Sequence, residues 1–397
     1  MDRTIILAMT EAANLLKEQA IFDPQGDWEA FTHQIPARWA VVLLADQQMR
    51  PVQLLCVKNL RACLRRRLGN EEPIAPSRKT DYRQIVRHIL WRRVDSAFEA
   101  DWIYYEAARL LFPKTYQGMV GFRPAWFLHV DPEAQFPRYV KTIDLSPRPG
   151  LLLGPVEDKH AAARLIELIE DCFDLCRYYQ ILVQAPAGRA CAYKEMGKCP
   201  APCDGSISMH QYHRMIDLSI SALLDPGDLV RQHTARMQQA AAELRFETAA
   251  KIKAYIGQLE QLPTGPYRYV RKLSDFAFVS LQRGSSTGAV QVFLILPGRI
   301  QPIATLLPRA DRPGDLLRTI LALAEEPSSP LDSSAAERIG VVCHHLFASA
   351  ARSGGVFIPM TELSEPRLSK ALAEIRKQKP PPETEGEGVI KELQAME

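Results

Sequence analysis

Four cysteines in the middle of the sequence have the residue type and the clustering of a metal site. They are Cys176, Cys191, Cys199 and Cys203, with fourteen, seven and three residues between successive members. Thiolate sulfur is a ligand for zinc and for the irons of an iron–sulfur cluster, and four thiolates complete either site. The spacing is not one of the common zinc-finger spacings. The residues alone therefore leave zinc, an iron–sulfur cluster and four unligated thiols as alternatives.

The other cysteines have weaker claims to metal binding. Cys172 lies one helical turn before Cys176 and is an alternative ligand. Cys56 and Cys63 fall on a predicted strand and a predicted helix, where a free cysteine usually fills the core. Cys343 precedes His344 and His345, which point in different directions on a predicted helix and have no carboxylate near them in the sequence. We interpret these two histidines as structural.

The cysteine distribution also indicates a compartment. Five of the eight cysteines lie between residues 172 and 203 of a 397-residue chain. Disulfide frameworks belong mainly to small secreted proteins, whereas the apolar run at this N-terminus is too short for a signal peptide. No stretch approaches the roughly eighteen apolar residues that a membrane span requires. We therefore expect a cytoplasmic protein without a membrane partner.

A predicted helical hairpin after the cysteines has apolar faces that it cannot bury by itself. Residues 228–263 carry one apolar stripe before the sequence ELRFE and a second stripe after it. So short a hairpin needs another helix pair or another domain to cover both stripes. The residues expected to contact such a partner are Met237, Leu244, Phe246, Glu247 and Ala250.

The remaining periodicities predict an α+β protein of two or three domains. A Gly-Pro turn is expected at 154 and 155, and Ser206 or Ser208 is expected to cap the helix that follows the cysteines. Strands are predicted at 39–46, 51–57, 123–130, 139–146, 275–282, 289–296 and 299–307. Helices are predicted at 1–21, 58–68, 78–94, 99–112, 159–175, 208–224, 313–325, 334–352 and 365–378.

The strongest local charge lies on the two helices predicted at 58–68 and 78–94. From residue 58 to residue 94 there are eleven basic and three acidic residues, a net charge of +8, whereas the whole chain has a net charge of +3. A phosphate-binding face and a pair of solvated helix surfaces explain this pattern equally well. The DNA-binding candidates are Lys58, Arg61, Arg65, Arg66, Arg83 and Arg87.

The cysteine segment and the hairpin together carry a family resemblance. The order Gly154-Pro155, Phe173-x-Leu175-Cys176-Arg177, then CxYxxxGxCxxPCxGxIS from Cys191 to Ser208, resembles the middle of UvrC, the incision subunit of bacterial nucleotide excision repair. The hairpin pattern from Met237 to Ile252 is similar to the UVR motif of that family. The resemblance implies an iron–sulfur cluster rather than zinc, no nucleotide cofactor, and docking of the hairpin onto a like hairpin of UvrB.

A weaker resemblance precedes this region. The strand pair followed by Lys58-Asn59-Leu60-Arg61 resembles the GIY-YIG nuclease domain. The positions of its catalytic arginine, metal-binding glutamate and asparagine fall on Cys63, Tyr104 and Gln117, and both tyrosine strands lack their tyrosines. Phosphodiester cleavage needs a carboxylate for the metal and a cation for the developing charge. We therefore expect a degenerate nuclease domain, with Arg61, Arg65, Glu106 and Glu99 as weak catalytic candidates.

These interpretations give a predicted organisation and function. The segments are an N-terminal helix (1–24), a small mixed-sheet, degenerate GIY-YIG-like domain (25–150), a cysteine-rich segment (151–227), the UVR hairpin (228–263), a carboxyl-terminal α/β module (264–378) and a flexible tail (379–397). The predicted function is a UvrC-like repair accessory that binds UvrB and DNA without cutting. The alternatives are an active single-incision endonuclease that uses displaced residues and a UVR-type adaptor for an ATPase outside repair.

Overall fold

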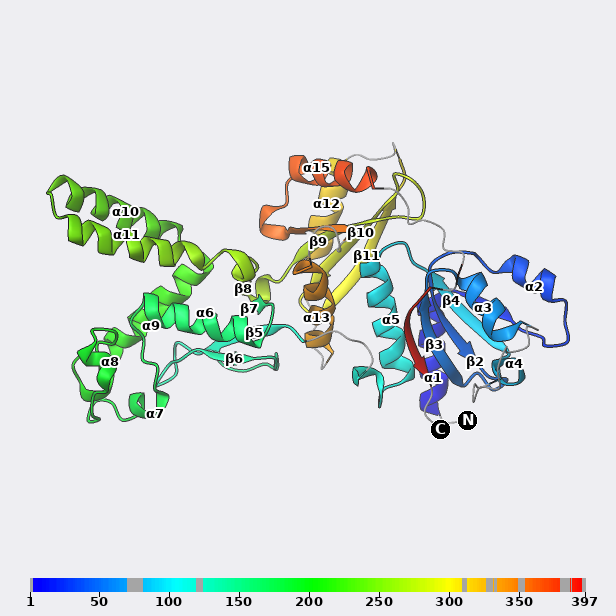
Figure 1. Ribbon diagram of the computed structural model, residues 1–397, viewed down its shortest axis with the longest axis horizontal. Helices are drawn as coiled ribbons and strands as arrows, with labels where there is room; N and C mark the ends of the chain where they lie inside the picture. The colour runs from blue at the N-terminus through cyan, green and yellow to red at the C-terminus, as the bar shows by residue number, and fades with distance from the viewer. Residues whose placement is uncertain are drawn as a thin grey trace.

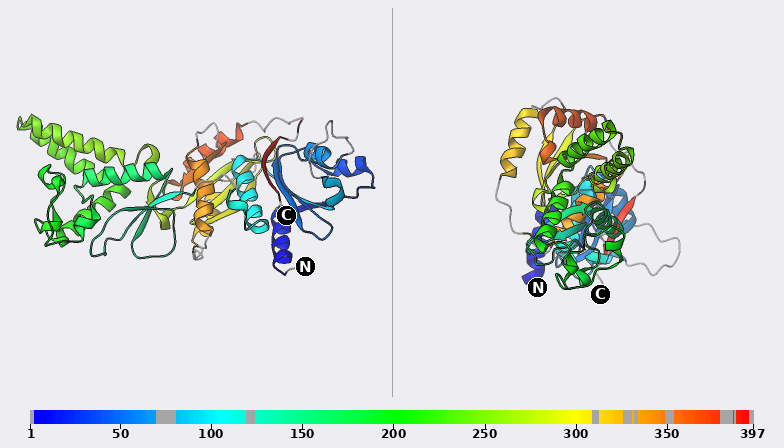
Figure 2. Two further views of the ribbon diagram at one scale, coloured as in Figure 1. Left: turned by 60° about the horizontal axis from the view of Figure 1, so that its bottom comes forward. Right: turned by 90° about the vertical axis from the view of Figure 1, so that its left-hand side faces the viewer.

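Three antiparallel sheets, each with its own helices, follow one another along an elongated molecule (Figure 1; Figure 2). The computed structural model describes residues 3–69, 81–118, 124–308, 313–325, 331, 334–348, 354–378, 386 and 388–394. The α+β class predicted from the sequence is confirmed. None of the helices in these ranges is long and apolar enough to cross a membrane.

The first sheet has helices on both faces because its strands alternate their side chains between two cores. Along β2, Val41 and Leu43 face helices α1 and α5, whereas Val42 and Leu44 face α3. The strand order is β1 (Glu18–Ile21), β4 (His88–Arg93), β2 (Ala40–Ala45), β3 (Pro51–Val57) and β13 (Val389–Gln394). Its helices are α1 (Arg3–Leu16), α2 (Trp28–Gln34), α3 (Leu60–Leu68), α4 (Tyr82–Ile85) and α5 (Ala97–Leu111).

Three predictions for this part of the chain were wrong. The helix predicted at 78–94 is the single turn α4 followed by strand β4, which pairs with β1 and β2, and residues 78–80 lie outside the described residues. The helix predicted at 1–21 ends at Leu16, and Lys17, with φ of 69°, leads into β1. The tail is not loose throughout, because β13 pairs with the edge of β3. The rest of the predicted tail lies largely outside the described residues.

The second sheet supports the cysteine segment. Its strand order is β6 (Val140–Thr142), β5 (Trp126–Val130), β7 (Leu151–Val156) and β8 (Arg271–Lys272). Gly154-Pro155 lies inside β7 rather than in the predicted turn, and a Cβ on Gly154 would meet the Phe127 ring at 2.5 Å. The expected boundary between residues 150 and 151 therefore falls inside one sheet.

Helices connect this sheet to the hairpin. They are α6 (Lys159–Cys172), α7 (Tyr179–Leu182), α8 (Ala192–Glu195), α9 (Met209–Leu224), α10 (Gly227–Ala242) and α11 (Phe246–Gln261). Ser208 caps α9 in a capping box with Gln211, which settles the choice between Ser206 and Ser208. The predicted hairpin is confirmed, and it projects from one end of the molecule (Figure 1).

The third sheet shares a core with the first unit. Its order is β11 (Arg299–Leu306), β10 (Val290–Leu296), β9 (Phe278–Arg283) and β12 (Gly355–Pro359), of which β12 was not predicted. One face packs on α12 (Pro313–Ala324) and α15 (Glu365–Arg376). The other face contributes Phe293 and Ile295 to a core with α5 and α13 (Ala335–Leu346). The helix predicted at 334–352 thus ends earlier, and residues 349–353 lie outside the described residues. Short 3-10 turns occur at Tyr116–Gly118, Pro202–Asp204, Gly265–Tyr267, Leu273–Asp275 and Met360–Glu362.

Candidate functional site

Three of the four predicted cysteine ligands lie buried in the segment between α6 and α9. Cys176 follows the end of α6, Cys199 lies in a loop, and Cys203 lies in the 3-10 turn before α9, while Cys191 is half-buried at the start of α8. Cys176 Sγ donates to the Tyr178 carbonyl at 3.6 Å, and its thiol also interacts with the Cys199 thiol. The sequence-distant members of the predicted set are therefore neighbours in the fold.

The Cys176–Cys199 pair favours one thiolate. The interaction with Cys176 lowers the pKa of Cys199 to about 6, against the opposing effect of burial, and the nearby Arg177 guanidinium also lowers it. The same interaction, together with burial, raises the pKa of Cys176 far above its ordinary value. Because metals bind the thiolate form, this pair holds one sulfur ready for coordination near neutral pH.

The packing of the segment fits a bound metal group. From residue 177 to residue 207, which the structure describes without a gap, the buried side chains are Leu182, Cys199, Ala201, Pro202 and Cys203. Its two α-helices have four residues each, and its polar contacts include a Lys194–Asp204 ion pair. A segment with so small a core gains stability from a metal that joins its ligands.

Cys172 lies beside the hairpin. It lines a surface hollow with His233 and Tyr255, and burial raises the pKa of its thiol to about 12. Cys56 and Cys63 are buried in the two cores of the first sheet, as expected. The alternative that Cys172 is a ligand stays a prediction.

The hairpin is anchored at its base and exposed at its tip. Leu259 and Leu262 are fully buried in the core that also contains α6, and the rings of His233 and Tyr255 are 4.7 Å apart. At the turn, Leu244 is 74% exposed and Phe246 is 64% exposed. Of the other predicted partner-binding residues, Glu247 and Ala250 are exposed and Met237 is half-buried. The tip therefore presents an uncovered apolar surface.

The predicted basic face is smaller than its charge suggested. Lys58, two residues before α3, and Arg65 and Arg66 within it are exposed. Three further DNA-binding candidates are partly buried and hold the backbone of loops. Arg61 Nε donates to the Ile35 carbonyl at 2.7 Å. A guanidinium nitrogen of Arg83 donates to the Pro24 carbonyl at 2.5 Å, and a guanidinium nitrogen of Arg87 donates to the Val86 carbonyl at 2.6 Å.

The weak catalytic candidates do not form one site. Arg61 and Arg65 lie on α3, which packs on one face of the first sheet, whereas Glu99 and Glu106 lie on α5, which packs on the opposite face. The sheet therefore separates the arginines from the carboxylates. The position of the metal glutamate holds Tyr104, which is fully buried.

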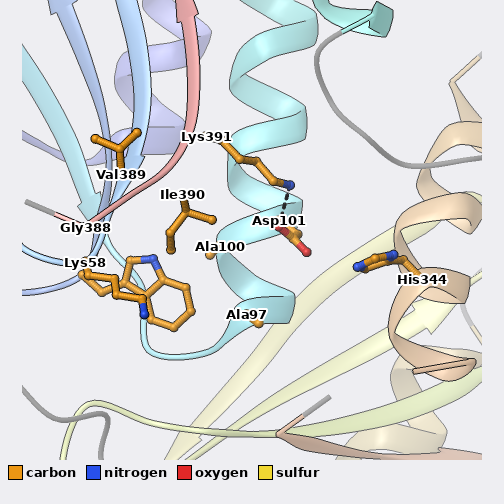
Figure 3. A pocket seen from close by; sticks show the side chains of 10 residues that line it. Lys58, Ala97, Ala100, Asp101, His344, Gly388, Val389, Ile390 and Lys391 are labelled. Atoms are coloured by element: carbon orange, nitrogen blue, oxygen red, sulfur yellow. Dashed lines mark hydrogen bonds and ion pairs between the residues drawn. The ribbon is translucent and has the colours of Figure 1, made fainter. Parts of the chain in front are cut away.

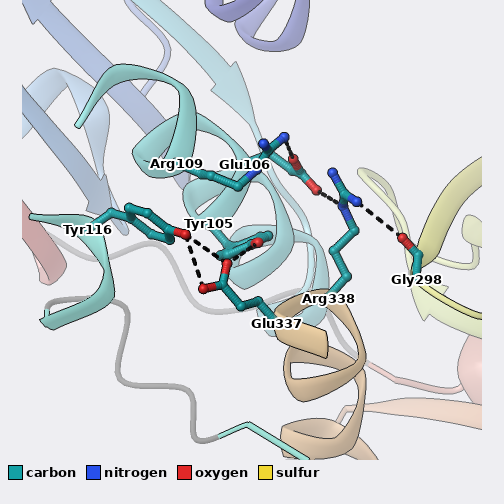
Figure 4. Close-up of polar contacts among 7 residues, drawn as sticks. All are labelled: Tyr105, Glu106, Arg109, Tyr116, Gly298, Glu337 and Arg338. Carbon is teal, nitrogen blue, oxygen red and sulfur yellow. Dashed lines mark hydrogen bonds and ion pairs between the residues drawn. The ribbon is translucent and has the colours of Figure 1, made fainter. Parts of the chain in front are cut away.

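Both carboxylates already have cationic partners. Glu99 is buried and accepts hydrogen bonds from the Arg92 guanidinium at 3.0 Å and from the Asp95 backbone N–H at 3.3 Å. Glu106 lies between Arg109 at 3.0 Å and Arg338 at 2.7 Å (Figure 4). These ion pairs give Glu106 a role in joining α5 to α13.

Two polar clusters between α5 and α13 could not be found from the sequence. In one, Tyr105 and Tyr116 donate to Glu337 (Figure 4). The Gln117 side-chain amide also donates to this carboxylate. In the other, Asp101 Oδ2 lies 2.9 Å from His345 Nε2, and Asp101 Oδ1 lies 2.6 Å from Lys391 Nζ. The carboxylate that contacts His345 is thus far from it in the sequence, because Asp101 comes from helix α5. No local pattern signals such long-range pairs.

Comparison with known proteins confirms the resemblance in the middle of the chain. Residues 125–222 match the UvrC/Cho excinuclease middle domain, and residues 227–262 match the UvrB/uvrC motif. The matched domains begin at residue 125, so the GIY-YIG interpretation of the preceding residues stays a prediction.

Individual relatives support the same region. UvrABC system protein C of Clostridium perfringens is 29% identical over 176 residues, which cover 44% of this chain and 28% of the relative. The protein of the same name from Campylobacter jejuni is 29% identical over 175 residues, and that from Thermoanaerobacter is 27% identical over 179 residues. The chain thus spans less than a third of the length of these relatives. No solved structure matches it.

Proposed function

We propose that this chain, which carries a UvrC middle domain and a UVR motif, serves nucleotide excision repair by docking onto a UvrB-like partner and by holding DNA without cutting it. The observation that carries the proposal is the projecting hairpin, whose base is packed and whose apolar tip is uncovered. An exposed apolar tip on an anchored element is typical of a helix-docking surface. Its direct test is retention of purified UvrB by the immobilised chain, and failure of UvrB to bind would overturn the proposal.

The exposed basic residues support the DNA contact. Lys58, just before α3, and Arg65 and Arg66 within α3 are exposed, and α3 lies at the end of the molecule opposite the hairpin (Figure 1). Phosphate contacts from such side chains provide affinity that is independent of sequence and falls steeply with salt. The chain can in this way hold DNA at one end while the hairpin holds its partner at the other.

We expect no incision by this chain. With Mg²⁺ or Mn²⁺, and with or without UvrB, damaged duplex should remain intact, because the arginines and carboxylates lie on opposite faces of the sheet. Strand nicking on a denaturing gel is the measurement. Glu106→Ala is the decisive variant, since nicking that falls with this change would support the alternative of an endonuclease with displaced residues.

The four cysteines would hold an iron–sulfur cluster. Cys176, Cys191, Cys199 and Cys203 would supply its thiolates, and the cluster would tie the poorly packed segment to α6 and α9. We expect chain purified without oxygen to be brown and to contain iron and sulfide. Cys199→Ser should lose most of this iron and its visible absorption.

Cys172→Ser is the matched control for the cluster. Cys172 is also buried near α9, but it faces α11, so its change should leave the iron content unaltered. Stoichiometric zinc in place of iron in the unaltered chain would show that the cluster assignment is wrong.

A further inference from the structure

The contact between α5 and α13 contains three metal-ligating side chains outside the cysteine segment. Asp101 lies on α5, and His344 and His345 lie on α13. One ligand atom from each of the three lies within 4.8 Å of the other two. We propose that Asp101, His344 and His345 bind a divalent transition-metal ion of the Zn²⁺ class, and that this ion joins the first sheet unit to the carboxyl-terminal module.

The ligand chemistry and the distances suit such an ion. Two imidazoles and one carboxylate are a common ligand set for zinc and its neighbours in the transition series. Bonds of about 2.0 to 2.2 Å would separate the ligand atoms by about 3.4 Å. Asp101 Oδ2 and His345 Nε2 are 2.9 Å apart, so the ion requires these two atoms to separate by only about half an ångström.

The surroundings hold two of the ligands in place. Lys391 Nζ binds Asp101 through Oδ1, which leaves Oδ2 directed at His345. The Phe98 ring packs edge-on against the His345 ring, with centroids 5.4 Å apart, and His345 is 4% exposed. Partners of this kind orient the ligands of metal sites and are part of their design.

The third ligand stands at an opening through which an ion can enter. Asp101 and His344 line a cavity of about 580 Å³ that also includes Trp39, Lys58 and Lys391. The His344 ring reaches from α13 toward Asp101 across this cavity (Figure 3). Three protein ligands would leave at least one coordination position open to the cavity, as in exchangeable rather than closed zinc sites.

A metal-free ion pair is the competing explanation for this cluster. The role of His344 distinguishes the metal site from the ion pair. The Asp101–His345 hydrogen bond and the Lys391–Asp101 ion pair are complete without an ion and do not require the His344 imidazole. A metal site does require it. His344 is exposed and takes no part in the Asp101–His345 hydrogen bond or the Lys391–Asp101 ion pair, although its ring packs edge-on against the His345 ring with centroids 5.1 Å apart.

The test measures Zn²⁺ binding to the full chain by equilibrium dialysis with elemental analysis of zinc and iron. The unaltered chain should bind one zinc ion through nitrogen and oxygen ligands at 2.0 to 2.2 Å in its X-ray absorption spectrum, distinct from sulfur at 2.3 Å. His344→Ala should weaken this binding at least tenfold without changing the iron content. His160→Ala, which alters an exposed histidine on α6, is the matched control and should bind as the unaltered chain does.

Zinc should also raise the melting temperature of the unaltered chain and of the control more than that of His344→Ala, because the ion joins two units of the fold. Equal zinc affinity in His344→Ala and the unaltered chain would overturn the proposal. A zinc spectrum with sulfur ligands alone would do so as well.

Discussion

Replacing Phe246 with alanine is expected to weaken the binding of a UvrB-like partner by about 100-fold. Phe246 begins α11 at the tip of the hairpin and is 64% exposed. An aromatic anchor that becomes buried in an interface contributes about 2 to 4 kcal/mol, and each 1.4 kcal/mol is a factor of ten in the dissociation constant. Titration of the immobilised chain with purified UvrB measures this change.

The Phe246→Ala variant should leave the hairpin folded. The anchoring residues Leu259 and Leu262 lie more than three turns away along α11 and are fully buried. An unchanged melting temperature would therefore assign the lost affinity to the interface. Leu7→Ala is the matched control, because Leu7 is 62% exposed on α1 at the other end of the molecule.

Two outcomes would contradict the docking proposal. Equal affinity of the Phe246→Ala and Leu7→Ala variants would show that the tip is not the contact. Capture of an ATPase from outside repair, with UvrB left unbound, would support the adaptor alternative instead.

Elements with local periodicity could be predicted, whereas those defined by distant partners could not. The β2–β3 pair, α3 and the α10–α11 hairpin carry their pattern within a few turns or strands. Strand β4 is buried on both faces, so HILWRR reads as a continuous apolar run with basic ends rather than as an alternation. Strand β13 depends on the free edge of β3, which lies at the opposite end of the sequence.

The candidate sites also differ in whether nearby or distant residues of the sequence define them. Three cysteines that lie within 28 residues of sequence come together after α6, because the spacing of nearby ligands is preserved in a short segment. The charge counted from residue 58 to residue 94 is instead divided by the sheet. Arg65 is exposed on the α3 face, whereas Arg92 is buried on the α5 face beside Glu99. Net charge along a sequence does not tell which side of a strand each cation occupies.

The buried ion pair between Arg92 and Glu99 provides the second large prediction. Their side chains are 11% and 4% exposed, and burial raises the pKa of Glu99 against the opposing effect of Arg92. Glu99→Ala would leave the Arg92 cation buried without its carboxylate. We expect this change to lower the free energy of unfolding by about 3 to 5 kcal/mol, measured by urea denaturation.

A neighbouring exposed pair is the control. Arg93 and Glu18 are also 3.0 Å apart, but their side chains are 60% and 36% exposed. Solvent screens such a pair, so Glu18→Ala should lower the free energy of unfolding by no more than about 1 kcal/mol. Similar losses for Glu99→Ala and Glu18→Ala would show that burial does not set the strength of the Arg92–Glu99 contact.

Removing both charges should be far less harmful than removing one. In the double variant Arg92→Met with Glu99→Leu, no charge remains buried, and apolar side chains of similar size fill the space between α1, β4 and α5. Replacement of a buried ion pair by packed apolar residues is often neutral or stabilising. If the losses of unfolding free energy from the two single changes simply added in the double variant, Arg92 and Glu99 would not be energetically coupled. Because this variant lacks the Glu99 carboxylate yet should stay folded, any DNA nicking that it retained could not depend on Glu99.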